Sequence, residues 1–315
     1  MECAMNRYGL VLVLGAAVFL GAAGSAHALT VVDPAAGCDQ ELNMAGEEYV
    51  LTGDLSCPTK TSGVRITASG VVFHLQGHTI SSPFCDLSVT LGGIVLEGDV
   101  TDIVVEGGTI SGFNDGIIFA GARNRVRGMT VSGACVFGVV VSGDSQQVDT
   151  SVVANNGMDG VAFGAAKDSS VRSSHIFGNK RDGVEISNFS DGNLVESNII
   201  HDNGEYEGFG VVIYNGQGNT IRGNAVNQNF NGIGIQSLAN TAEQNSVSAS
   251  RQTGISISAI GAGSTVLGNI VFGSGLLDMT DEVAACGTNT WSGNTFQTDE
   301  AGGIPDGGPS VPCIQ

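Results

Sequence analysis

Apolar residues recur along the chain in a short motif, a glycine followed by two inward positions separated by one outward position. The motif Gly-[Ile/Val]-x-[apolar] begins at residues 93, 116, 138, 160, 183, 210, 232 and 254. These starting points are evenly spaced except between 183 and 210, where the interval is longer. Alternation with period two and a high content of β-branched residues predict strands. A repeat of about 22 residues predicts a solenoid in which each coil stacks on the next.

Two further apolar columns follow the same period. The first contains Leu75, Val105, Val126, Val148, Val171, Leu194, Ile221, Ala242 and Val266. The second lies five residues later and contains Ile80, Ile110, Val131, Val153, Ile176, Ile199, Val226, Val247 and Val271. Three inward columns per coil, joined by turns, predict an all-β fold. Because parallel strands joined by a crossover are right-handed in nearly all proteins, we expect a right-handed parallel β-helix of about nine coils.

Polar residues also recur with this period. Asn224, Asn245 and Asn269 occupy one position on successive coils, which predicts an internal asparagine ladder with side-chain amides bonded along the stack. An outward column of alternating sign consists of Glu106, Arg127, Asp149 and Arg172. We interpret this column as a salt-bridge ladder in which the charges are structural.

The two ends of the chain depart from the repeat. Residues 1–28 contain a short apolar run after Arg7 and end in Ala26-His27-Ala28, which is typical of a secretory signal peptide. We assign residues 29–62 to an N-terminal cap, 63–275 to the β-helix, and 276–315 to a C-terminal cap and tail. We expect a secreted or periplasmic protein without a membrane span in the mature chain, and a monomer.

Six cysteines remain after the predicted cleavage, an even number that favours disulfides in an exported protein. Proximity in sequence suggests the pairs Cys38–Cys57 and Cys286–Cys313, which leaves Cys85 with Cys135. Since Cys85 and Cys135 lie two coils apart, the insertion between residues 81 and 92 must run along the stack. The cysteines and the scattered histidines show no zinc spacing, and we expect no resident metal or other cofactor.

The net charge of −19 argues against a nucleic-acid partner on electrostatic grounds. The same charge disfavours an acidic polysaccharide, unless Ca²⁺ bridges it to the protein. A neutral glycan fits better.

One region combines features of a site. Glu185 is the only charged residue in its outward column, and the longer interval after residue 183 adds a loop rich in acids beside it. The candidate catalytic residues are Asp182, Glu185 and Glu207, and the candidate substrate-binding residues are Glu205, Tyr206 and Tyr214. Carboxylates at this density either bind a cation such as Ca²⁺ or raise one another's pKa. The alternative is that Asp182-Gly183 is simply a turn and that the remaining charges decorate the surface.

The repeats, the entry segment GVVFHLQGHTISS (70–82) and the closing segment CGTNTWSGNTF (286–296) resemble exported right-handed β-helix proteins of the pectin-lyase-like superfamily. The NosD-like repeat group is the most similar in pattern. This resemblance implies the fold and leaves the function open, because the superfamily includes polysaccharide enzymes, adhesins and proteins without known activity. The catalytic motifs of polygalacturonases and alginate epimerases are not found.

Two functions follow from these observations. The first is an exported binding or surface-structural module with a carbohydrate ligand, favoured because stacking explains most polar columns. The second is a polysaccharide hydrolase or lyase that uses the acidic residues around Glu185, where a tyrosine could stack on a sugar ring.

Overall fold

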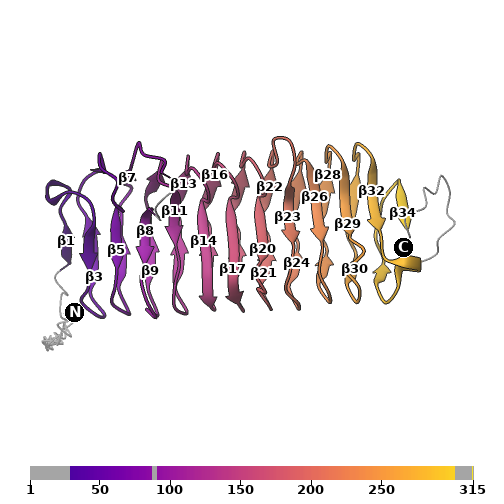
Figure 1. Ribbon diagram of the computed structural model, residues 1–315, viewed down its shortest axis with the longest axis horizontal. Helices are drawn as coiled ribbons and strands as arrows, with labels where there is room; N and C mark the ends of the chain where they lie inside the picture. The colour runs from indigo at the N-terminus through magenta and orange to yellow at the C-terminus, as the bar shows by residue number, and fades with distance from the viewer. Residues whose placement is uncertain (1–28, 87–90, 302–313, 315) are drawn as a thin grey trace, which may run out of the picture.

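The computed structural model describes residues 29–86, 91–301 and 314. These residues form an elongated rod of short parallel strands, with the chain advancing from one end to the other coil by coil (Figure 1). The strands belong to three sheets that run along the rod, and every strand pairing is parallel. Only two short 3-10 helices, η1 (Pro34–Ala36) and η2 (Ala284–Cys286), interrupt the described strands.

Two sheets contain 12 strands and one contains 10. Sheet A consists of β1 (Thr30–Val32), β3 (Glu48–Leu51), β6 (Val72–His74), β9 (Val104–Glu106), β12 (Arg125–Arg127), β15 (Gln147–Asp149), β18 (Ser170–Arg172), β21 (Leu194–Glu196), β24 (Thr220–Arg222), β27 (Thr241–Glu243), β30 (Thr265–Leu267) and β33 (Thr290–Ser292). Sheet B consists of β2 (Gln40–Leu42), β5 (Val64–Ile66), β8 (Gly92–Leu96), β11 (Asp115–Ile118), β14 (Val139–Asp144), β17 (Val161–Lys167), β20 (Val184–Ser187), β23 (Phe209–Ile213), β26 (Asn231–Ile235), β29 (Thr253–Ile257), β32 (Leu277–Asp281) and β34 (Asp299–Ala301). Sheet C consists of β4 (Leu55–Ser56), β7 (Thr79–Ser81), β10 (Thr109–Ser111), β13 (Thr130–Ser132), β16 (Val152–Ala154), β19 (His175–Phe177), β22 (Ile199–His201), β25 (Ala225–Asn227), β28 (Ser246–Ser248) and β31 (Ile270–Phe272).

The predicted β-helix is therefore confirmed, with about 11 turns rather than nine. The count differs because strands β1 to β4, before residue 62, and β32 to β34, after residue 275, pair with the same sheets. These strands continue the stack without the Gly-[Ile/Val] motif that the sequence count relied on. The predicted cap boundaries at residues 62 and 275 stay a prediction.

The motif column of sheet B forms the core as predicted. Its inward residues, all fully buried, are Ile117, Val139, Val161, Val184, Val211, Ile233 and Ile255. Val184 stacks between Val161 of the preceding coil and Val211 of the next. This column is continuous along the rod, so its apolar contacts stabilise neighbouring coils against one another.

In the other two sheets, the residue paired in register differs from the predicted one at three places, by two positions at Leu75 and by one position at Leu194 and at Ile199. The pairings are Phe73 with Val105 in place of Leu75, Val195 with Val171 in place of Leu194, and Ile200 with Ile176 in place of Ile199. Where two apolar residues are adjacent, their alternation does not show which one points inward. Ile199 is 51% exposed, whereas Ile200 is fully buried.

The motif requires glycine because its position has no room for a side chain. A Cβ atom on Gly183 would lie 2.5 Å from the carbonyl oxygen of Gly210 and 2.7 Å from a methyl group of Ile200. Both distances are far inside van der Waals contact, so the coil above could not stack at its present spacing. The repeat of glycine every coil is therefore a packing requirement of the corner between sheets C and B.

Asparagine ladders run along all three corners of the coil, where the sequence predicted one. The buried side chains that donate along the stack are Asn156, Asn179 and Asn203 between sheets C and B, Asn193 and Asn219 between sheets B and A, and Asn198, Asn224, Asn245 and Asn269 between sheets A and C. Each Nδ2 donates to the Oδ1 of the next coil over 2.8 to 3.1 Å. The ladders satisfy polar groups inside bends that could not be buried otherwise.

The charged column on sheet A is aligned in register, as predicted. Arg127 lies beside Glu106 and forms an ion pair with it. Asp149, which lies beside Arg127, pairs instead with Arg125 over 2.8 Å. These charges belong to the scaffold and are not candidates for a site.

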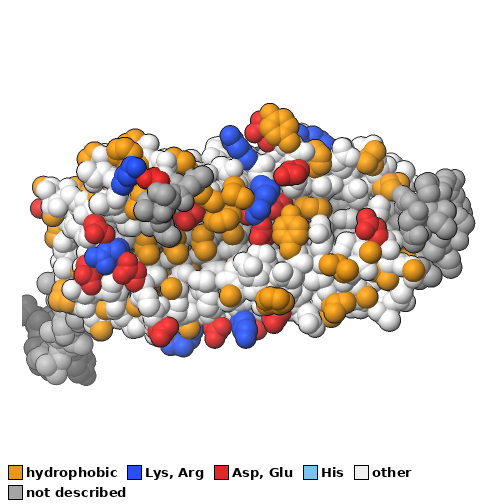
Figure 2. All heavy atoms as spheres, in the orientation of Figure 1, with side chains coloured by type: hydrophobic (Ala, Val, Ile, Leu, Met, Phe, Trp, Pro, Cys, Tyr) orange, Lys and Arg blue, Asp and Glu red, His pale blue; other side chains and the backbone are white. Residues whose placement is uncertain are grey.

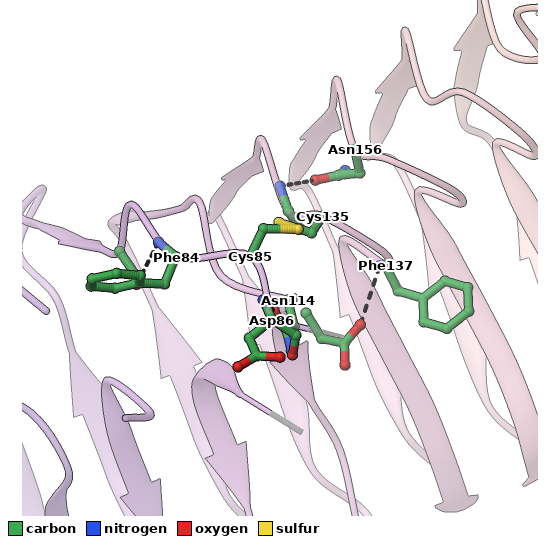
Figure 3. The surroundings of a disulfide bond; sticks show 10 residues. Phe84, Cys85, Asp86, Asn114, Cys135, Phe137 and Asn156 are labelled. Carbon is green, nitrogen blue, oxygen red and sulfur yellow. Dashed lines mark hydrogen bonds between the residues drawn. A yellow bond between two sulfur atoms is a disulfide. The ribbon is translucent and has the colours of Figure 1, made fainter. Parts of the chain in front are cut away.

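Two of the predicted disulfides are confirmed among the described residues, Cys38–Cys57 and Cys85–Cys135. The segment before Cys85 leaves β7 and runs along the stack to Cys135, which follows β13 two coils away (Figure 3). Asp86 fastens this segment to the coil between them, because its N–H donates to Oδ1 of Asn114 over 2.8 Å. Cys286 is disulfide-bonded, and its predicted partner Cys313 lies outside the described residues.

These disulfides fit an oxidising compartment, outside the cell or in the periplasm. The predicted signal peptide, residues 1–28, lies outside the described residues. Within the described part of the chain, no helix is long and apolar enough to cross a membrane. The monomeric state stays a prediction.

Candidate functional site

A cluster of ionisable side chains lies on sheet B where β17, β20 and β23 are neighbours. Asp159 and Asp182 each precede a motif glycine, one coil apart. Oδ1 of Asp159 accepts the N–H of Asp182 over 3.0 Å, and Oδ1 of Asp182 accepts the N–H of Phe209 over 2.7 Å. The two carboxyl groups thus continue along the stack in the way the asparagine ladders do. Asp182 is thus a buried residue of the stack, and a functional role beyond this structural one stays a prediction.

Arg181 holds this cluster together. Its Nε donates to Oδ1 of Asp159 over 2.8 Å and its Nη2 to Oδ2 over 2.5 Å, a bidentate pair. Nη2 also forms an ion pair with Glu185, and Nε lies 3.3 Å from Oδ2 of Asp182. Three carboxyl groups therefore share one guanidinium.

Burial of the cluster is uneven and decides which groups face solvent. The side chains of Asp159 and Asp182 are 0% exposed, that of Glu185 is 12% exposed, and that of Arg181 is 30% exposed. Glu185 occupies an outward position as predicted, but its neighbours cover it. Figure 2 shows acidic and basic side chains together near the middle of this face, over β20 and β23.

The electrostatics favour a proton on Asp182. Burial, and then the negative charge of Asp159, raise the pKa of Asp182 to about 8, against the opposing effect of Arg181. Burial likewise raises the pKa of Glu185. The raised pKa of Asp182 favours a carboxylic acid at this point of the cluster at neutral pH, and perturbed pKa values of this kind are common at functional sites.

Tyr214 extends the cluster toward solvent. Its hydroxyl donates to Oδ2 of Asp182 over 3.5 Å, and its pKa is raised by burial and then by the charge of Asp182. The structure thus brings together three of the predicted site residues: Asp182, Glu185 and Tyr214.

The other three predicted residues lie on the loop between β22 and β23. Glu205, Tyr206 and Glu207 are exposed, with Tyr206 at 79%. Among the described residues they make no hydrogen bond or ion pair with the cluster. The backbone of the loop is held from a later coil by Arg251, whose Nη1 donates to the carbonyl oxygen of Glu205 over 2.9 Å.

A groove of about 680 Å³ continues from the cluster along the same sheet. It spans β23, β26, β29 and β32, and its lining includes Phe209, Asn231, Gln236, Thr253 and Ser256. Phe209 connects the two features, since its backbone N–H binds Asp182 and its side chain lines the groove. A glycine at position 234 leaves space for this ring, because a Cβ atom there would lie 2.5 Å from it.

The carboxyl groups of Asp159, Asp182 and Glu185 offer oxygen atoms within 4.8 Å of one another. Among the described residues, this is the one set of acidic side chains close enough together to share a cation. Arg181 already supplies positive charge at this point. A Ca²⁺ ion would have to displace its guanidinium. Calcium binding stays a prediction.

Sequence reasoning recognised Glu185 and the acidic loop but missed the role of Arg181. The signal that could have revealed it is the column shared by Asp159 and Asp182, which occupy equivalent positions on successive coils. A basic residue next to two stacked, buried aspartates is the expected counterion. The groove could not be found in this way, because its lining residues are ordinary strand and turn residues of four different coils.

A family model described as a right handed beta helix region matches residues 92–247. No curated protein matches the chain. Solved structures that resemble it include the A-module of mannuronan C-5 epimerase AlgE6 from Azotobacter vinelandii, with a TM-score of 0.60 and 15% identity over 85% of this chain and 81% of that one.

In two further similar structures, the alignment covers less than two thirds of the other chain. The Dettilon tailspike protein has a TM-score of 0.63 and 16% identity, over 86% of this chain and 62% of that one. The catalytic domain of a GH87 α-1,3-glucanase in complex with nigerose has a TM-score of 0.56 and 12% identity, over 84% of this chain and 63% of that one. At these identities the similarity shows the right-handed β-helix fold alone, and the pectin-lyase-like superfamily and the NosD-like grouping stay predictions.

Proposed function

Because a right handed beta helix model matches residues 92–247, and similar solved structures include a mannuronan epimerase and an α-1,3-glucanase, we propose that this chain binds a polysaccharide along the outer face of sheet B. The glycan would lie in the groove over β23 to β32 and reach the cluster at Glu185 and Tyr214.

The observation that carries this proposal is the continuity of groove and cluster through Phe209. The groove offers an aromatic ring together with amide and hydroxyl groups, which are the partners that sugar hydroxyls and sugar ring faces require. A flat parallel sheet presents these groups at a regular spacing along the rod. An extended chain molecule suits such a surface better than a compact ligand does.

The charge of this face favours a neutral polysaccharide. The cluster is negative, the groove is bordered by Asp281 and Glu282, and the whole chain has a net charge of −19. A polymer of uronic acids would be repelled unless a divalent cation bridged it.

Affinity electrophoresis of the purified protein against a panel of neutral and acidic polysaccharides, with and without Ca²⁺, tests the proposal. We expect retardation by at least one neutral glycan, weakened by Phe209→Ala and by Glu185→Gln. The matched control is Glu196→Gln, which removes a carboxylate paired with Arg222 on sheet A and should leave binding unchanged. If no polysaccharide is bound, or if the control weakens binding as much, the proposal fails.

A second candidate function is cleavage of the bound glycan at the cluster. In its favour, burial raises the pKa of Asp182 to about 8, Glu185 beside it is more exposed, and Tyr214 is hydrogen-bonded to Asp182. Glycoside hydrolysis uses one protonated and one ionised carboxyl group. Since Asp182 is fully buried, its proton would reach a substrate by a relay, in which the hydroxyl of Tyr214 turns to accept the hydrogen of Asp182 and gives its own hydrogen to the glycosidic oxygen.

The same polysaccharide panel tests this second candidate through released reducing ends and the absorbance of unsaturated products. Tyr214→Phe keeps the aromatic ring and removes the hydroxyl, so it should abolish cleavage and preserve binding. Binding without products in the wild-type protein would leave the binding function and exclude the enzyme.

A further inference from the structure

Two histidines that are distant in the sequence meet on sheet C, away from the site described above. His175 begins β19 and His201 ends β22, the neighbouring strand. Their Nε2 atoms lie 2.6 Å apart. The side chain of His201 is 23% exposed and that of His175 is partly exposed, so both can be reached from solvent.

The orientation of His201 is fixed from two sides. Its Nδ1 lies 2.6 Å from Oδ2 of Asp202, a carboxylate that can only accept a hydrogen bond when ionised. The hydrogen of the neutral ring therefore belongs on Nδ1, and Nε2 presents its lone pair. Phe177 stacks on this ring with centroids 5.1 Å apart and planes 5° apart.

His175 faces the same point. Phe177 also packs against its ring, with centroids 4.6 Å apart. When its hydrogen is on Nδ1, both Nε2 lone pairs converge. Two neutral imidazoles that converge, one of them supported by a carboxylate on the far nitrogen, form the arrangement that protein ligands adopt toward zinc, copper and nickel.

We propose that His175 and His201 bind one divalent transition-metal ion, of the zinc, copper or nickel class, with Asp202 orienting His201. Water molecules would complete the coordination, because the described residues place no carboxylate, imidazole or thiolate here as a third ligand beside the two histidines. With metal–nitrogen bonds of about 2.0–2.1 Å at a tetrahedral angle, the two nitrogen atoms would be roughly 3.3 Å apart. Small rotations of the two rings provide that separation, since the torsion about a bond to an aromatic ring is soft.

This proposal revises the expectation from the sequence that no metal is bound. The histidines are scattered along the chain and lack any recognised spacing, but the stacking of coils places residues one coil apart next to each other. The site does not depend on the proposed polysaccharide function, because it lies on a different sheet.

Titration calorimetry on untagged protein freed of metal by a chelator tests the site, with Zn²⁺ and Cu²⁺ as probes. We expect one ion per chain, and nitrogen ligands in the electron paramagnetic resonance spectrum of the Cu²⁺ form. His175→Ala and His201→Ala should each remove this binding, and Asp202→Asn should weaken it about 10- to 100-fold.

The matched control is His74→Ala, because His74 also pairs with a carboxylate, Glu106, over 2.8 Å but has no imidazole partner in the described chain. It should bind metal like the wild type. Circular dichroism checks that each variant is folded, and the added ion should raise the melting temperature of the wild type but not of His175→Ala. An absence of saturable binding, or binding by the two histidine variants equal to that of the wild type, would show that the pair forms only a hydrogen bond and would overturn the proposal.

Discussion

Replacing Asp182 by Asn should change how the stability of the protein depends on pH. The substitution keeps the size of the side chain and its Oδ1, which accepts the N–H of Phe209 over 2.7 Å. It removes the ionisable proton. Asp182→Asn therefore isolates the titration of this buried group from its structural role in the stack.

The expected effect follows from the difference between the folded and unfolded states. In the unfolded chain an aspartate loses its proton near pH 3.8, whereas burial and the charge of Asp159 raise the pKa of the folded group to about 8. Between these values the folded state holds one proton more than the unfolded state. The contribution of Asp182 to stability is thus fully present below about pH 4 and is lost as the pH rises to about 8. At about 1.4 kcal/mol for each pH unit, the loss amounts to several kcal/mol.

Urea unfolding followed by circular dichroism, at pH values spaced between about 4 and about 9, measures this effect. The free energy of unfolding of the wild type minus that of Asp182→Asn should decrease with pH up to about 8 and then become constant. The control is Asp191→Asn, because Asp191 also accepts an N–H of the next coil, over 2.7 Å, but is exposed. If the curves of the wild type and Asp182→Asn are parallel throughout, Asp182 is ionised in the fold and the reasoning about the cluster is wrong.

Three further predictions concern the scaffold. Val184→Asp should lower the free energy of unfolding by several kcal/mol, because it places a carboxyl group in a fully buried apolar column; an unchanged urea midpoint would contradict the assigned register. Gly183→Ala should be strongly destabilising, since its Cβ would lie 2.5 Å from a carbonyl oxygen, whereas Gly164→Ala, whose Cβ would meet only an amide at 3.5 Å, should be tolerated; equal melting temperatures would disprove the packing explanation. Cys85 and Cys135 should resist thiol labelling in denatured, unreduced protein, and replacing both by Ser should cost about 4 kcal/mol in the chain-entropy account; labelling of either residue would show that the bridge is absent.

The fold could be predicted because the physical requirements of a stacked coil recur in every repeat. Each coil needs inward apolar residues and one corner position without a side chain. Val184 could therefore be assigned to the core, and Gly183 to the corner, from the alternation and the period alone. The same reasoning failed where two apolar residues adjoin. Leu194 and Val195 are equally hydrophobic, and the length of the preceding turn, which decides between them, has no periodic signal.

The site was less predictable, because its properties arise between coils. Glu185 could be recognised as an unusual outward charge, but its burial depends on where Arg181 and Tyr214 lie. The raised pKa of Asp182 depends on its depth and on Asp159, which belongs to the preceding coil. The meeting of His175 and His201 likewise requires the register of sheet C, which the sequence columns had shifted by one residue at Ile199.

The loop between β22 and β23 shows how this architecture can acquire new surface chemistry. The interval from Gly183 to Gly210 is longer than the interval from Gly210 to Gly232 that follows, yet Val184 and Val211 remain paired in sheet B. Extra length is absorbed at the corner between sheets C and B without a shift in the pairing of the strands on either side of it. Homologues could exchange this segment, as antibodies exchange their hypervariable loops on a constant framework, and acquire a different ligand without a new fold.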